Sequence, residues 1–294
     1  MQYKNSVSRK TFLIFNNVLL IAAALLCLLP FIHVLAISFS SSTAAMSGAV
    51  KLWPVDFTLK SYEFIADRPA FIKSFVVAVE RVVIGAPISL VLTILAAYPL
   101  SKGKNNFKYR TFYVWFYMIS MLFSGGLIPW YMTIKYTGLI DSIWALIIPC
   151  AVQVFYIILL LNFFRELPKE LDEAAYIDGA GHWRLLWQIY VPLSKPALAT
   201  ILLFITVNHW NSWFDGLILM NRPEHYPLQS YMQTIIVGKD MAKISEKDIA
   251  ILKLVNDRTS KAAQVFIGTV PILLIYPFLQ KYFTTGIVMG SVKG

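Results

Sequence analysis

Charged residues are scarce in this chain. Only 14% of its 294 residues are Asp, Glu, Lys or Arg, whereas a soluble domain carries about a quarter. Hydrophobic residues make up 57% of the sequence and aromatic residues 15%. This imbalance excludes an ordinary soluble globular domain and indicates that lipid is the main solvent of the chain.

Patterns typical of enzymes and metal sites are also missing. The two cysteines, Cys27 and Cys150, lie inside apolar runs, which argues against a disulfide framework. The four histidines lack metal-ligand spacing, and the sequence has no HExxH, CxxC or nucleophile-elbow motif. No GxxxxGK[ST] phosphate loop occurs either, since "GKD" at 238–240 lacks the upstream glycine and the hydroxyl residue. We therefore expect no enzyme activity, catalytic residue, metal or cofactor in this chain.

The net charge is +10, but no basic patch with interleaved aromatics lies outside the apolar runs, which argues against nucleic acid as a partner. In membrane proteins a basic excess reflects cytoplasmic loops rich in Lys and Arg. The basic start and the apolar run from Phe12 to Phe39 resemble a secretory signal. The run is too long and lacks a small-x-small cleavage pattern, so we interpret it as a retained first span.

Six apolar stretches are long enough to cross a bilayer as helices, which takes about 20 residues each. The third contains "FSGGLIPW", where Gly125, Gly126 and Pro129 should bend or break the helix. Such breaks are tolerated where neighbouring protein or a water-filled cavity satisfies the freed backbone groups. The chain is therefore predicted to be an all-α polytopic membrane bundle with an interior path. The six stretches are 12–39, 72–100, 111–133, 142–163, 197–220 and 262–285.

The distribution of basic residues predicts the orientation of the bundle. With the N-terminus inside, the inner segments hold Lys4, Arg9, Lys10, Lys102, Lys104, Lys108, Arg110, Arg165, Lys169, Arg184 and Lys195. The short outer loops hold only Lys51, Lys60, Arg68 and Lys135. We therefore expect cytoplasmic tails over 1–11 and 287–294, a transmembrane domain over 12–286 and a cytoplasmic loop over 165–195. The loop 221–261 is expected outside, where "YPLQSYMQTIIV" and an amphipathic "DIAILKLV" indicate a small external structure.

The cytoplasmic loop is a polar segment between two apolar spans. "KELDEAAYID" predicts a short helix with acidic residues at its favourable N-terminal end, and glycines end it. "HWRLLWQIY" predicts a second helix, stopped by Pro192, with an apolar stripe of Trp183, Leu186, Trp187 and Tyr190. An amphipathic hairpin on the inner membrane surface is an open alternative. The small face of Ala174 and Ala175 favours docking of the first helix against a protein partner instead.

Glu173-Ala174-Ala175, then Gly179 after three residues, then Ile189-Tyr190-Val191-Pro192 after nine more, resembles the EAA loop of permease subunits in bacterial ATP-binding-cassette (ABC) importers. Val191 departs mildly from that pattern, which has leucine there. "FSGGLIPWYMTIKYTGLIDSIWALIIP", "NHWNSWFDGL", "YPLQSYM" and "GIVMGSVKG" resemble the carbohydrate-importer branch, more narrowly MalG-like permeases of the LplC/YtcP type. The resemblance covers the chain from about Phe71 to its end.

This resemblance implies a type I importer permease in the bacterial cell (cytoplasmic or inner) membrane, which imports a sugar or oligosaccharide. The implied partners are a second homologous permease, a dimer of ATPase subunits that carries ATP and Mg, and an extracytoplasmic solute-binding protein. In the family, the short helix docks in a cleft of the ATPase and transmits its closure. The residues assigned to this ATPase coupling are Glu170, Asp172, Glu173, Ala174, Ala175, Asp178, Gly179, Ala180 and Gly181.

Polar residues in the fifth predicted span form a further candidate site. On a continuous helix, Asn208, Asn211, Ser212 and Asp215 fall within an arc of about 100°, while Trp210 and Trp213 point elsewhere. They line a translocation pathway, together with Gly125 and Gly126, or they hydrogen-bond between helices; both interpretations stay open. In the second span, Glu80 and Arg81 should each need a partner on another helix or subunit, and an ion pair is favoured over substrate contact.

Two other function classes were weighed. Half of a gradient-driven secondary transporter needs carboxylates or a proton relay near mid-membrane, and only Asp215 and Glu80 qualify, neither of them centrally. A membrane scaffold or sensor is disfavoured by the broken third span and the polar fifth span. The residues do not distinguish uronic-acid sugars from neutral ones.

Overall fold

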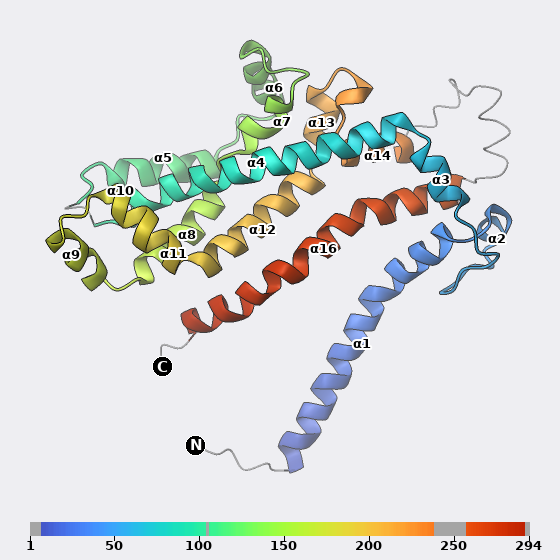
Figure 1. Ribbon diagram of the computed structural model, residues 1–294, viewed down its shortest axis with the longest axis horizontal. Coiled ribbons are helices and arrows are strands. Elements are labelled where there is room, and N and C mark those ends of the chain that lie inside the picture. Colours follow the sequence, from blue (N-terminus) through green and yellow to red (C-terminus); the bar gives the residue numbers. More distant parts are fainter. Residues whose placement is uncertain (1–6, 104–105, 238–256, 292–294) are drawn as a thin grey trace. The chain divides into compact units, whose positions relative to one another are not determined.

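Apolar runs that exclude water must satisfy their backbone hydrogen bonds internally, and in this chain they do so as helices. The computed structural model describes residues 7–103, 106–237 and 257–291, among which no strand occurs (Figure 1). Lys4, Lys104 and the predicted amphipathic "DIAILKLV" lie outside the described residues. The chain divides into two units, Met1–Pro69 with Ile235–Val270 and Ala70–Thr234 with Pro271–Gly294, and each is described by itself.

The first unit contains α1 (Val7–Ser38), α2 (Ser42–Met46), α3 (Lys60–Ala66) and the first part of α16 (Asp257–Ser291). None of the most apolar window of α1 is buried within the chain, which suits a helix surrounded by lipid or by another membrane protein. A small core forms where α1 ends, and Arg258 donates a hydrogen bond of 3.1 Å from Nη1 to the carbonyl oxygen of Ala45.

The second unit contains the long helix α4 (Pro69–Ser101), which runs from α14 at one end to α10 at the other (Figure 1), and the last part of α16. Aromatic contacts mark both ends, Phe71 against Tyr231 and Tyr98 against His182. The other elements are α5 (Arg110–Leu122), α6 (Leu127–Tyr136), α7 (Ile143–Ile147), η1 (Ile148–Cys150), α8 (Val154–Glu166), α9 (Glu170–Ile177), α10 (His182–Leu185), η2 (Leu186–Tyr190), α11 (Val191–Leu193), α12 (Lys195–Asn211), α13 (Phe214–Leu219), η3 (Pro223–His225) and α14 (Leu228–Val237).

The predicted break in the third span is confirmed. Helices α5 and α6 meet at 116°, and Gly126 between them has φ 87° and ψ 177°. That conformation is essentially restricted to glycine, so the sequence places the bend at this residue.

The fourth and fifth predicted spans are bent as well. The fourth bends by 48° between η1 and α8. The fifth is not the continuous helix that we expected over 197–220, because α12 ends at Asn211 and α13 begins only at Phe214. By length and composition, two described helices qualify as single spans, or up to five if each bent pair counts as one.

Candidate functional site

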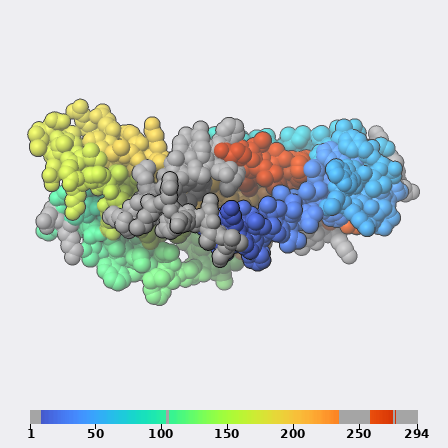
Figure 2. Space-filling view, turned by 90° about the horizontal axis from the view of Figure 1, so that it is seen from below, coloured from blue at the N-terminus to red at the C-terminus, as the bar shows by residue number. Residues whose placement is uncertain are grey.

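The first candidate site is the segment 165–195, where the predicted short helix is confirmed as α9 with Glu170, Asp172 and Glu173 in its first turn. The segment forms one end of the second unit (Figures 1 and 2). Gly179 follows the helix with φ 71°, a left-handed conformation that glycine adopts without steric cost. Among the residues assigned to ATPase coupling, the exposed ones are Glu170, Glu173, Ala174, Asp178, Gly179 and Gly181.

Three residues of the predicted coupling set are less exposed. Ala175 is buried in the core of the second unit, in one cluster with Leu160, Phe164 and Leu185. Ala180 is half-buried, and Asp172 is directed toward α4. The small face attributed to Ala174 and Ala175 is therefore divided, with Ala174 outward and Ala175 packed against the chain itself.

Sequence reasoning missed Ile177. Its side chain is 86% exposed at the end of an acidic helix, and it lies four residues after Glu173, on the same helical face. An isolated apolar residue one turn beyond the Glu-Ala-Ala triplet was the signal that could have identified it.

The predicted second helix of the loop is irregular. It consists of α10, a π-helical turn η2 and α11, and it continues past Pro192 to Leu193. Its predicted stripe is split, because Leu186 and Tyr190 are buried whereas Trp183 and Trp187 are exposed. A π turn adds a residue to the helical repeat, which breaks the regular spacing on which the stripe was predicted.

A polar cluster joins this segment to the end of α4. Lys102 donates from Nζ to an Asp172 carboxylate oxygen at 2.5 Å and to the Tyr190 hydroxyl at 2.8 Å. Tyr190 in turn donates to the other Asp172 oxygen at 2.8 Å. Burial lowers the pKa of Lys102, against the opposing effect of Asp172, and burial together with Asp172 raises the pKa of Tyr190. Sequence reasoning assigned Lys102 to topology only.

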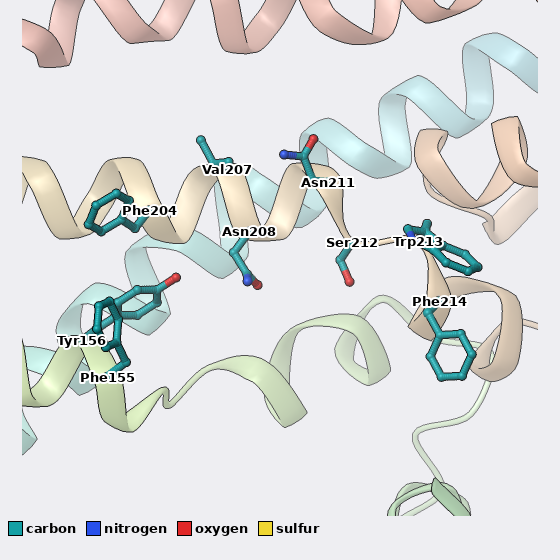
Figure 3. A pocket seen from close by; sticks show the side chains of 9 residues that line it. All are labelled: Phe155, Tyr156, Phe204, Val207, Asn208, Asn211, Ser212, Trp213 and Phe214. Carbon is teal, nitrogen blue, oxygen red and sulfur yellow. The ribbon is translucent and has the colours of Figure 1, made fainter. Parts of the chain in front are cut away.

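The second candidate site is a pocket of about 530 Å³ around the end of α12 (Figure 3). Asn208 and Ser212 project from α12 toward the side where Phe155 and Tyr156 lie (Figure 3). The predicted placement of Trp213 away from these polar groups is wrong, since Trp213 lines the same pocket. The helical arc assumed a continuous helix, whereas Ser212 is extended with ψ 125° and turns the chain. The full lining is Phe155, Tyr156, Phe204, Val207, Asn208, Asn211, Ser212, Trp213 and Phe214.

Asp215 lies on the other side of this break. It receives a forked interaction from Arg81, with Nη1 at 3.2 Å from Oδ1 and Nη2 in contact with Oδ2. Ser212 also donates to Oδ1, at 2.9 Å. Arg81 is only 1% exposed, and the expected pairing of Arg81 with another helix is confirmed, while Glu80 is exposed.

A neighbouring pocket, of about 670 Å³, contains Asp215 together with Gly125 and Gly126. Ser212 lines both pockets, so the break between α12 and α13 brings all six predicted pathway residues to one of two neighbouring pockets. Asn208 also accepts a hydrogen bond of 3.3 Å from Gln153. The fifth-span residues therefore line a pocket, and Asn208 also bonds between helices, while their role in a translocation pathway stays a prediction.

The described residues form helices with broken spans, a polar break in the fifth span and an acidic helix at one end of the second unit, which are features of a transport-system membrane subunit. The family model of the binding-protein-dependent transport system inner membrane component matches residues 68–288. The chain belongs to this family, and the resemblance found in the sequence is confirmed.

Individual relatives agree with this assignment. The chain is 37% identical to protein LplC of Bacillus subtilis, over 99% of this chain and 97% of that protein. It is 38% identical to the polygalacturonan/rhamnogalacturonan transport system permease protein YtcP of the same species, over 94% and 96%. The trehalose/maltose transport system permease protein MalG of Thermococcus litoralis is 27% identical over 99% of both chains.

Solved structures share the fold. A chain from the crystal structure of a bacterial ABC transporter involved in the import of the acidic polysaccharide alginate superimposes with a TM-score of 0.87 and 33% identity, over 96% of this chain and 100% of that one. A chain of the alginate transporter in complex with an alginate pentasaccharide-bound periplasmic protein shares the fold at a TM-score of 0.55 and 15% identity.

Proposed function

We propose that this chain is a transmembrane subunit of an ATP-driven, binding-protein-dependent importer of a sugar or oligosaccharide. It has six spans in the type I arrangement, with both termini in the cytoplasm. A second homologous permease completes the bundle, because six helices are too few to enclose an oligosaccharide. A dimer of separate ATPase subunits binds ATP and Mg, and a solute-binding protein delivers the sugar at the external loop 221–261.

Coupling to the ATPase is assigned to the segment 169–179. The observation that carries this proposal is the outward face of α9, where exposed Glu173 and Ala174 adjoin an exposed Ile177. Exposed apolar side chains within a charged helix are typical of a docking surface. When bound ATP closes the ATPase dimer, α9 moves with the cleft that holds it and switches the bundle between inward and outward access.

The sugar path is assigned to the two pockets around Ser212. The Asn208 and Asn211 amides can exchange hydrogen bonds with sugar hydroxyls, and Phe155, Phe204 and Trp213 offer flat apolar faces for the rings. The names of YtcP and MalG and the alginate transporter support a saccharide as the substrate class.

Purification of the chain from its native membrane in mild detergent, with partners identified by mass spectrometry, tests the function. We expect recovery of an ATPase, a second permease and a binding protein. Ile177→Asp or Glu173→Arg should lower the amount of recovered ATPase at least tenfold while the second permease is retained. The first change buries a new charge in the interface and the second reverses an existing one, and an unpaired buried charge is costly. Ile177→Val is the matched control and should retain the ATPase.

The opposite outcome is equally informative. A chain recovered alone, or only with copies of itself, would refute the importer and favour the gradient-driven transporter. If the Ile177→Asp variant retained the ATPase, docking through α9 would be refuted, while the importer function would stand.

A further inference from the structure

The cluster at the end of α4 closes a ring of three hydrogen bonds. Lys102, Asp172 and Tyr190 each bond to the other two. They come from three places in the chain, since Lys102 lies 70 residues before Asp172 and 88 before Tyr190. The ring therefore ties α4, α9 and η2 together.

The ammonium group at the centre of the ring is largely shielded from water. Lys102 is 6% exposed, and its Nζ lies 4.1 Å from the ring centroid of Tyr190 and 4.8 Å from that of Tyr98. Tyr190 also packs edge-on against Phe164 of α8, with centroids 5.3 Å apart. A charge-assisted bond that is removed from solvent is stronger than an exposed one, so this contact can transmit force between α9 and α4.

The attachment of α9 makes such a link necessary. The helix is short, Gly179 follows it in a left-handed conformation, and it is held to the bundle through the buried Ala175 and through Asp172. Ala175 offers only a methyl group. The hydroxyl of Tyr176 also lies 3.4 Å from Nδ1 of His182, whose ring contacts Tyr98 of α4. The charged contact between α9 and the residue that follows α4 is the carboxylate of Asp172.

We propose that Lys102 is a positioning residue that transmits the motion of α9 to α4, with Asp172 and Tyr190 as the two ends of the link. This inference rests on the proposed coupling of α9 to an ATPase. Without the Lys102 contact, α9 still docks on the ATPase and ATP is still hydrolysed, but the bundle no longer switches between inward and outward access. The residue acts on transport through other residues and touches no substrate.

The π-helical turn η2 supports this role independently. Such turns are rare and occur frequently at functional sites, because the wider turn costs backbone hydrogen-bond geometry. Here Tyr190 is the last residue of the turn and forms two of the three bonds of the ring. The irregular backbone thus coincides with the residue that joins the carboxylate to the ammonium group.

The test follows access to the pocket without requiring the sugar. Asn211→Cys, combined with Cys27→Ser and Cys150→Ser, provides a single reporter thiol at the pocket. In inside-out membrane vesicles containing the whole importer, a membrane-impermeant maleimide labels this thiol from the cytoplasmic side. Labelling is compared with and without ATP and vanadate, which trap the closed ATPase. Vanadate should slow labelling about tenfold, within the usual range of coupling between sites.

In the Lys102→Met and Asp172→Asn variants, vanadate should slow labelling by less than about twofold, while the ATPase stays bound and its rate of hydrolysis is retained. Lys102→Arg preserves the positive charge and should restore most of the effect. Lys108→Met, at an exposed lysine in the same connection, is the matched control and should leave the response unchanged. Tyr190→Phe removes one hydroxyl group without unfolding the chain, and vanadate should then slow labelling only about threefold.

Each outcome has one meaning. A full response in Lys102→Met or in Tyr190→Phe overturns the link. If the chain with only the reporter substitutions shows no vanadate response, the proposed coupling fails and the link fails with it. If the Lys102→Met variant also loses the ATPase, the link is tested by Tyr190→Phe instead: a weakened vanadate response supports it and a full response overturns it.

Discussion

Two buried cations lie about 30 Å apart along α4, and they are held in different ways. Arg81 meets Asp215 with a two-pronged fork, beside the break in the fifth span. Lys102, which directly follows the last residue of α4, meets Asp172 with a single ammonium group. A guanidinium fork fixes the orientation of a carboxylate, whereas an ammonium group on a flexible stem can follow a partner that moves.

The comparison assigns different mechanical roles to the middle and to the C-terminal end of one helix. At Arg81 the helix forms a fixed joint with the wall of the pocket, because Asp215 is also held by Ser212 and by the amide of Gly216. The Lys102 end forms an adjustable joint with the segment expected to meet the ATPase. Helix α4 runs without interruption from Arg81 to Ser101, so it can transmit a displacement between the two joints.

Removing the carboxylate at the fixed joint should have the largest effect. Asp215→Ala leaves Arg81 buried without its counter-charge, which costs about 3–5 kcal/mol. The double variant Arg81→Met/Asp215→Ala should recover most of that loss, because neither charge then remains buried. Thermal unfolding of the purified complex in detergent measures both.

Glu80→Ala is the control for this pair, since Glu80 is exposed next to Arg81 on α4. Its unfolding midpoint should stay near that of the unmodified chain. If the double variant unfolded at a midpoint as low as that of Asp215→Ala, the loss of stability would not come from the unpaired charge of Arg81. The contrast between the two joints would then be refuted.

A smaller effect is expected at the bend that lines the same pocket as Asp215. Gly126→Ala places a side chain at φ 87°, which costs about 1–3 kcal/mol. Gly125→Ala is the matched control, because its added carbon meets Pro129 at an ordinary 3.6 Å. The unfolding midpoint should fall for Gly126→Ala and stay unchanged for Gly125→Ala. Equal midpoints would show that the bend does not depend on the conformation of Gly126.

The sequence predicted the features that depend on local chemistry. The break at "GGLIP" follows from the backbone freedom of glycine, and α9 follows from its acidic start and glycine end. Both are properties of a few neighbouring residues. The need of Arg81 for a partner also followed, because an isolated charge in a bundle is costly.

The identity of partners far apart in the chain could not be predicted. The arc through Asn208 and Asp215 assumed one helix, and nothing local showed that α12 stops at Asn211. The pairing of Lys102 with Asp172 depends on how α9 folds back on α4, so the basic residue was attributed to topology alone. The π turn at Tyr190 likewise results from packing, which periodicity does not describe.

A third carboxylate is paired with an exposed cation and can be compared with the two pairs whose cations are buried. Asp141 lies in the turn between α6 and α7 with φ 64°, and it accepts hydrogen bonds from the amide of Asn221 at 3.0 Å and from the ring of His225 at 2.9 Å. It also pairs with Arg222, whose side chain is 67% exposed. A surface pair of this kind contributes about 1 kcal/mol or less.

The pH dependence of this turn is the smallest effect expected. Burial acts to raise the pKa of Asp141, but the bonds from His225, Asn221 and Arg222 outweigh it and lower the pKa. A lowered pKa means that the stabilisation is complete at neutral pH and is lost only as the pH falls below about 4. Hydrogen exchange at the amide of Asn221, corrected for its intrinsic pH dependence, should show protection that holds to about pH 4.5 and declines below it. Asp141→Asn tolerates the left-handed backbone and should weaken this protection at every pH. Protection that vanished already near pH 6 would mean that a group other than the Asp141 carboxylate controls the turn.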